Sequence, residues 1–107
     1  MKGKVVIVTG GSSGMGKYMA KKFVADGANV VITGRDVERL QAAKEEIQSP
    51  NGNILTVTMD VRNIEDVKRM VEETVAEFGT IDCLINNAAG NFICPAEKLS
   101  ANGWKSV

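Results

Sequence analysis

The chain has 107 residues, with 13 basic and 13 acidic side chains, no net charge at pH 7 and 44% hydrophobic content. This balance suits one globular unit and makes nucleic acid a poor partner, because no excess positive charge is available for a phosphate backbone. With no histidine and only two cysteines, the chain excludes Ser-His-Asp and Cys-His nucleophilic sites and offers almost no metal ligands, so we expect no metal.

The apolar runs of the sequence are short. The longest, residues 5–8, is far too short to cross a bilayer, and no signal-peptide core or cleavage site accompanies it. We therefore expect a cytoplasmic protein without membrane contact. In such a reducing compartment, Cys83 is expected to be a small core residue without a disulfide bond.

Strand-like and helix-like stretches alternate from the start of the chain. The β-branched run over residues 5–8 is typical of a strand buried on both faces. A glycine-rich segment over 10–16 follows, and then a predicted helix that extends to about Asp26 and ends at Gly27. The larger apolar residues that recur every fourth position on this helix are Met15, Met19 and Phe23.

The remaining elements continue the alternation. Further strands are predicted over 30–32, 54–59 and 81–85. Asp36 is expected to cap one helix, Asn63 to cap another that Gly79 closes, and Ser100 to begin one more. The helix after Asn63 carries on one side Val67, Met70, Val71, Thr74 and Phe78.

This alternation predicts an α/β fold, a doubly wound parallel sheet of the Rossmann type with strand order 3-2-1-4 and helices on both faces. A complete fold of this kind has about six strands, and only four are predicted here. We therefore expect residues 1–107 to be a single truncated unit whose C-terminal strands and helices are missing. The uncovered edge of the fourth strand would then invite pairing or aggregation.

The glycine-rich segment joins the first strand to the first helix. Glycine there lets the backbone turn tightly and lets a pyrophosphate approach without meeting a Cβ. The helix N-terminus adds free N–H groups and the positive end of its dipole, and two serine hydroxyls can add donors. The alternative is a glycine-rich turn without a ligand.

The spacing of this segment is Gly-x3-Gly-x-Gly. Together with Asp60 after the third strand and the Asn-Asn-Ala-Ala-Gly segment 86–90 after the fourth, it resembles the short-chain dehydrogenase/reductase family. The resemblance covers the whole chain and implies an NAD(P)-binding oxidoreductase. It implies that the cofactor pyrophosphate is held by Gly10, Ser12, Ser13, Gly14, Met15 and Gly16.

The same resemblance implies the rest of the cofactor site. Asp60 would accept a hydrogen bond from the adenine amine, with Val61 beside the ring, although a strand-end cap is the alternative for Asp60. The sequence departs slightly from the family where Ala89 precedes a glycine. The other wall of the crevice would be formed by Asn87, Ala88 and Gly90.

Arg35 bears on which dinucleotide is bound. NAD-specific sites usually carry an acid at the end of the second strand, but Gly34 occupies that end here. The guanidinium of Arg35 suits a 2′-phosphate by its charge and its paired donors, whereas Asp36 is better placed to cap a helix. We therefore expect NADPH as cofactor, with NAD as the alternative; a solvated surface arginine is the other interpretation of Arg35.

The catalytic signature of the family is Tyr-x3-Lys on a later helix, where the lysine lowers the pKa of the tyrosine for proton transfer. Tyr18 and Lys22 have this spacing, but they follow the glycine-rich segment directly, where such a pair is ordinary helix-surface chemistry. The resemblance therefore implies catalytic residues beyond Val107 and none within the chain.

Residues 88–92, Pro95 and residues 99–100 resemble the 2,4-dienoyl-CoA reductases. This implies NADPH-dependent reduction of a dienoyl thioester in fatty-acid metabolism by an enzyme that is a homo-oligomer when complete. Contacts with the acyl-CoA would come from Arg62, Phe92 and Ser100. Solvation, core packing and a helix cap are the respective alternatives for these three. A 3-oxoacyl or alcohol/sugar carbonyl reductase of the same family, and a non-catalytic nucleotide-binding module, are the alternative functions.

Overall fold

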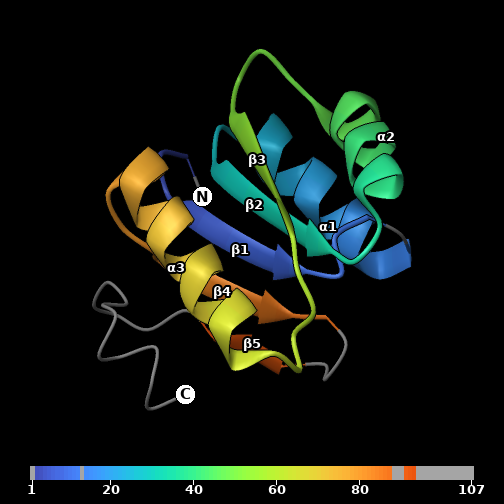
Figure 1. Cartoon of the computed structure of the whole chain (residues 1–107). Helices are drawn as coiled ribbons and strands as arrows, with labels where there is room; N and C mark the ends of the chain where they lie inside the picture. Colours follow the sequence, from blue (N-terminus) through green and yellow to red (C-terminus); the bar gives the residue numbers. More distant parts are fainter. Residues whose placement is uncertain (1, 13, 88–90, 94–107) are drawn as a thin grey trace.

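The computed structural model describes residues 2–12 and 14–87, together with the backbone of 91–93. The strands are β1 (Val5–Thr9), β2 (Asn29–Gly34), β3 (Asn53–Thr58), β4 (Cys83–Asn86) and β5 (Asn91–Ile93). The helices are α1 (Gly14–Ala25), α2 (Val37–Ile47) and α3 (Ile64–Phe78). The strands form one sheet in the order β3-β2-β1-β4-β5, in which β1 to β4 pair in parallel (Figure 1).

Helices cover both faces of this sheet. Val6 and Val8 of β1 pack in one hydrophobic cluster with α1 and α2, whereas Ile7 between them packs in a second cluster with α3. Figure 1 shows α3 on the opposite side of the sheet from α1 and α2. The predicted doubly wound sheet with strand order 3-2-1-4 is therefore confirmed.

The helix ends follow the predicted caps. The Oδ1 atoms of Asp36 and Asn63 each accept hydrogen bonds, of 2.9 to 3.2 Å, from the backbone N–H groups two and three residues later. Gly79 ends α3 with a φ of 85°, in the left-handed region that favours glycine. None of the described helices is long and apolar enough to span a membrane.

The large periodic residues of α1 do not form its most buried side. The residues that α1 buries are Gly16, Ala20 and Val24. Met15 is 65% exposed, while Met19 and Phe23 are partly buried at the edge of the cluster. Because small residues let the helix approach the sheet closely, packing distance overrides side-chain hydrophobicity here.

The region after β4 corrects two expectations. β5 pairs antiparallel with β4, so the β4 edge is covered and the sheet is not purely parallel. The segment between the strands lacks the Asn-Gly or Asp-Gly pair that signals a tight hairpin, so sequence periodicity did not indicate this return. Cys83 is 5% exposed and disulfide-bonded, contrary to the expected reduced thiol, because the redox compartment does not determine which chain segments meet. The other cysteine, Cys94, lies outside the described residues.

Candidate functional site

The carboxyl ends of β1, β2 and β3 open into a cavity of about 530 Å³. Its lining residues are Thr9, Gly10, Thr33, Gly34, Arg35, Met59, Asp60, Val61 and Arg62. Ligands of open parallel sheets bind beyond the carboxyl ends of the strands, where the connections diverge. Five of the residues that sequence analysis predicted for ligand contact, from three separate segments, therefore meet at the expected edge.

The glycine-rich segment 10–16, which includes the start of α1, has no room for side chains at two of its glycines. A Cβ on Gly11 would lie 2.6 Å from Cγ2 of Ile32, and one on Gly16 would lie 2.5 Å from the carbonyl oxygen of Gly10. Gly10 and Gly14 have φ values of +66° and +57°, which L side chains rarely adopt. These positions therefore require glycine, and the missing side chains are also what the close approach of a pyrophosphate requires.

Asn87 joins the end of β4 to this loop. Its backbone N–H donates to Oγ1 of Thr9 at 3.2 Å, and its Nδ2 donates to the carbonyl oxygen of Gly10 at 3.5 Å. The Thr9 hydroxyl lies 3.1 Å from Oδ1 of Asn86 and 3.3 Å from the carbonyl oxygen of Ile85, its two acceptors. Sequence analysis missed Thr9, although a hydroxyl at the end of a buried apolar strand was a usable signal.

Thr33 lines the cavity and carries a buried hydroxyl that is unpaired within the described residues. Its side chain is 1% exposed, and within the described part of the chain its Oγ1 is buried without a hydrogen-bond partner. A buried polar group left unpaired costs about 1–3 kcal/mol. A polar group of a ligand in the cavity would remove that cost, so this atom fits a ligand site.

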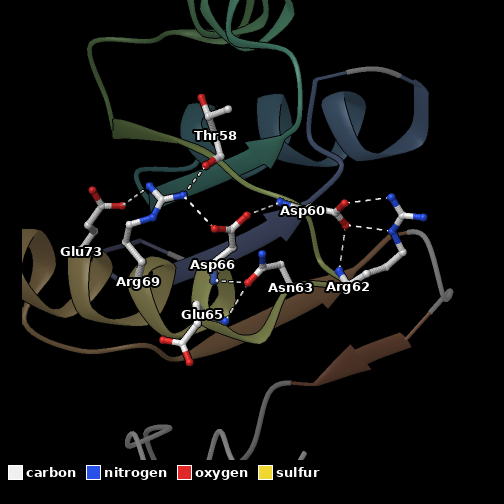
Figure 2. Close-up of polar contacts among 8 residues, drawn as sticks. All are labelled: Thr58, Asp60, Arg62, Asn63, Glu65, Asp66, Arg69 and Glu73. Atoms are coloured by element: carbon white, nitrogen blue, oxygen red, sulfur yellow. Dashed lines mark hydrogen bonds and ion pairs between the residues drawn. The ribbon is translucent and has the colours of Figure 1, made fainter.

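Asp60 lies just beyond β3 and is held by Arg62. Nε and Nη2 of Arg62 donate to Oδ1 and Oδ2 of Asp60 at 3.1 and 2.9 Å (Figure 2). The backbone N–H of Arg62 donates to Oδ1 at 2.9 Å, and Nη1 of Arg35 lies 4.0 Å from Oδ2. The side-chain hydrogen bond from Arg62 and then its backbone hydrogen bond lower the pKa of Asp60 to about 2. The same pairing raises the pKa of Arg62, so Asp60 and Arg62 are both charged at neutral pH.

Comparison with known proteins assigns the chain to a family. A model of the short chain dehydrogenases matches residues 4–107. The chain belongs to this family. Its members are oxidoreductases that bind NAD or NADP.

Individual relatives show which members of the family the chain is similar to. The chain is 56% identical over 107 residues to a probable 2,4-dienoyl-CoA reductase, (2E)-enoyl-CoA-producing, of Bacillus subtilis (strain 168), covering 100% of this chain and 42% of that relative. A crystal structure of a short chain dehydrogenase from Bacillus anthracis str. 'Ames Ancestor' is 65% identical, with a TM-score of 0.79 over 99% of this chain and 43% of that one. A metagenomic short-chain oxidoreductase in complex with NADP is 36% identical, with a TM-score of 0.75 over 81% of this chain and 39% of that one. The chain thus spans less than half the length of each of these proteins, and the predicted similarity to dienoyl-CoA reductases is confirmed.

The structure describes only some of the other residues that were predicted to contact a ligand in this short chain dehydrogenase. Met15 is exposed at the start of α1, and Oγ of Ser12 lies 3.4 Å from where a Cβ on Gly34 would stand. Arg62, expected at an acyl-CoA site, lines the same cavity as Arg35. For Phe92 only the backbone is described. The predicted contacts outside the described residues are Ser13, Ala88, Gly90 and Ser100.

Tyr18 and Lys22 lie on the outer surface of α1. Tyr18 is 58% exposed, and Nζ of Lys22 lies 5.4 Å from the centroid of its ring. Neither residue lines the cavity. The geometry is that of a cation–π pair on a helix surface, as the sequence position indicated.

Proposed function

We propose that this chain provides the cofactor site of an NADPH-dependent reductase that acts on a 2,4-dienoyl-CoA or a related acyl thioester in fatty-acid metabolism. The observation that carries the proposal is the cavity in which two exposed guanidiniums, of Arg35 and Arg62, stand beside the carboxylate of Asp60. The identity with the named dienoyl-CoA reductase supports the substrate class. When bound, NADPH supplies the hydride.

The residues of the cavity suit an adenine nucleotide that carries a 2′-phosphate. Asp60 offers an acceptor for the adenine amine, and Val61, 46% exposed, offers an apolar surface for the ring. Arg35 is 72% exposed, so its guanidinium is open to a phosphate. Because β2 ends at Gly34, that strand end has no acidic side chain of its own to select a free 2′-hydroxyl.

The glycine loop suits the pyrophosphate of the same ligand. Positive φ values at Gly10 and Gly14 and the tight packing at Gly16 keep side chains away from the start of α1. The first N–H groups of that helix are then open to an anion, as is the positive end of its dipole. Asn87 would form the opposite wall through its bonds to the loop.

The remaining parts of the proposal rest on the sequence resemblance. Arg62, Phe92 and Ser100 would contact the acyl-CoA, and the catalytic tyrosine and lysine would lie outside residues 1–107. A cytoplasmic location and a homo-oligomeric enzyme are also predictions from the sequence. The disulfide at Cys83 is a feature that a reducing compartment disfavours, so fractionation of cells is the direct test of the location.

Calorimetric titration with adenosine 2′,5′-bisphosphate and adenosine 5′-monophosphate tests the cofactor. We expect the bisphosphate to bind about ten- to a hundredfold more tightly, the range for hydrogen bonds to a charged group. Arg35→Leu should remove most of that preference. Arg39→Leu is the matched control, since Arg39 is equally exposed at 73% but pairs with Asp36 and does not line the cavity. Equal binding of both nucleotides by the wild-type protein would contradict the proposal.

The substrate class needs a separate assay. NADPH oxidation is followed spectrophotometrically with a 2,4-dienoyl-CoA, and in parallel with a 3-oxoacyl thioester and simple ketones. Turnover of the dienoyl thioester is the expected result. Turnover confined to the carbonyl compounds would instead support a carbonyl reductase of the same family.

A further inference from the structure

Two side chains of α3 hold the backbone on which Asp60 stands. Oδ2 of Asp66 accepts a hydrogen bond from the backbone N–H of Asp60 at 3.0 Å. Nη2 of Arg69 donates to the carbonyl oxygen of Thr58 at 2.6 Å. Figure 2 shows both side chains reaching from α3 to the end of β3, on the side of Asp60 away from Arg62.

The two side chains are themselves fixed. Arg69 lies between two acids of its own helix, 3.7 Å from Asp66 and 3.6 Å from Glu73. The backbone N–H of Asp66 is held by the cap residue Asn63 at 3.2 Å. On the first turns of α3, Asp66 is therefore a preorganised acceptor and Arg69 a preorganised donor.

Their contacts lie on either side of Met59. The Thr58 carbonyl belongs to the peptide before Met59, and the Asp60 N–H belongs to the peptide after it. Met59 is 4% exposed, and its own N–H donates to the carbonyl oxygen of Gly34 at 2.8 Å. Both peptides that lead to Asp60 are thus tied to α3, while Met59 is tied to β2.

The carboxylate of Asp60 follows the orientation of these peptides, because only two side-chain torsions separate it from the backbone. Recognition of a ligand group by a hydrogen bond requires placement to within about 0.5 Å. Neither Asp66 nor Arg69 lines the cavity, so neither is placed to touch a ligand there. Their hydrogen bonds on either side of Met59 give these residues a route to the ligand site through the backbone of Asp60.

We propose that Asp66 and Arg69 are positioning residues that determine selectivity for a 6-amino purine by fixing the Asp60 carboxylate at the cavity. This inference rests on the proposed function, in which Asp60 accepts a hydrogen bond from the ligand amine. It adds two residues that no ligand touches to those on which adenine recognition depends.

The test compares adenosine 2′,5′-bisphosphate with inosine 2′,5′-bisphosphate, whose carbonyl replaces the 6-amine. In calorimetric titrations the wild-type protein should favour the adenosine nucleotide about tenfold, the worth of one hydrogen bond to a charged acceptor. Asp66→Ala and Arg69→Ala should reduce this ratio to roughly one to threefold. The affinity for the inosine nucleotide should stay near the wild-type value, which an unfolded variant could not show.

The chain offers matched controls. Glu65 and Lys68 lie on the same turns of α3, carry the same charges and pair with each other at 3.8 Å. Glu65→Ala and Lys68→Ala should keep the wild-type ratio. Asp66→Asn retains an oxygen acceptor for the Asp60 N–H and should keep most of the preference for the adenosine nucleotide. If an alanine variant does not fold, Arg69→Lys provides the same test, because it keeps the charge but not the guanidinium fork. We expect a reduced ratio of adenosine to inosine nucleotide affinity in this variant.

The outcomes separate the two proposals. No preference for adenosine in the wild-type protein would overturn the role of Asp60 in the proposed function, and the positioning role with it. A wild-type preference that survives in folded Asp66→Ala and Arg69→Ala would overturn the positioning role alone. An equal loss of preference in the Glu65 and Lys68 controls would also overturn it, because a general effect of helix charge would then suffice.

Discussion

Gly16 lies on the buried side of α1, directly beneath the glycine loop. Replacing glycine by alanine inside a helix ordinarily stabilises a protein by about 0.8–1.0 kcal/mol. At this position, however, the new Cβ would stand 2.5 Å from the carbonyl oxygen of Gly10 and 2.9 Å from Nδ2 of Asn87. The first of these is a backbone atom, so the helix or the loop must move to relieve the contact.

The magnitude follows from these opposing effects. Overpacking in a well-packed interior costs about 1–3 kcal/mol. Loss of the 3.5 Å hydrogen bond from Asn87 to Gly10 adds about 0.5 kcal/mol. After subtracting the stabilisation that alanine gives inside a helix, we expect Gly16→Ala to lower the free energy of unfolding by about 1–2 kcal/mol. Because Gly10 lines the cavity, the displacement should also weaken binding of adenosine 2′,5′-bisphosphate.

Urea denaturation and calorimetric titration of the same samples measure the two effects. Gly79→Ala is the control: Gly79 has a φ of +85° with nothing within 4 Å, so it should lose about 1–2 kcal/mol through backbone strain alone. Because Gly79 is remote from the cavity, nucleotide affinity should not change in that variant. A Gly16→Ala protein that is more stable than wild type, with unchanged nucleotide affinity, would refute this reasoning.

Two further predictions concern Asp60 and the cap of α3. Because hydrogen bonds from Arg62 lower the pKa of Asp60 from 3.8 to about 2, the stability that the ionised carboxylate contributes is present above pH 3.8 and is lost as the pH falls through 2. Arg62→Gln should flatten this loss in urea titrations at each pH, and an unchanged profile would contradict the assignment. Asn63→Ala removes the acceptor for two backbone N–H groups at the start of α3 and should lower the free energy of unfolding by about 1 kcal/mol, with no change expected if the cap is not formed.

The fold was predictable where the determining interactions are local or periodic. The β-branched run of β1 signals burial on both faces, and all of its residues are buried. The caps at Asp36 and Asn63 depend on atoms only two and three residues away, so sequence position alone identifies them. Right-handed crossovers limit the possible arrangements of the sheet, and the order 3-2-1-4 is that of the Rossmann-type fold which the alternation of strands and helices predicted.

Other features depend on contacts that periodicity does not encode. The buried side of α1 is set by how closely Gly16 lets the helix approach the loop, and hydrophobicity favours the larger neighbouring residues instead. The pairing of β5 with β4 depends on a reversal of chain direction without a tight-hairpin signal. In both cases the local sequence permits more than one arrangement, and tertiary packing determines which one forms.

The site shows the same division. Gly10 and Arg35 were predicted as contacts from their places directly after strands, and Asp60 from the family resemblance, whereas Asp66 and Arg69 carry no signal beyond ordinary helix polarity. Arg62 was expected to contact a separate ligand, yet the turn before Asn63 brings its backbone N–H and its guanidinium to the carboxylate of Asp60. A ligand amine at Asp60 must therefore share or displace the hydrogen bonds of Arg62. Under the proposed function, adenine recognition by Asp60 and the availability of Arg62 for a phosphate are therefore coupled, because Arg62 binds the same carboxylate.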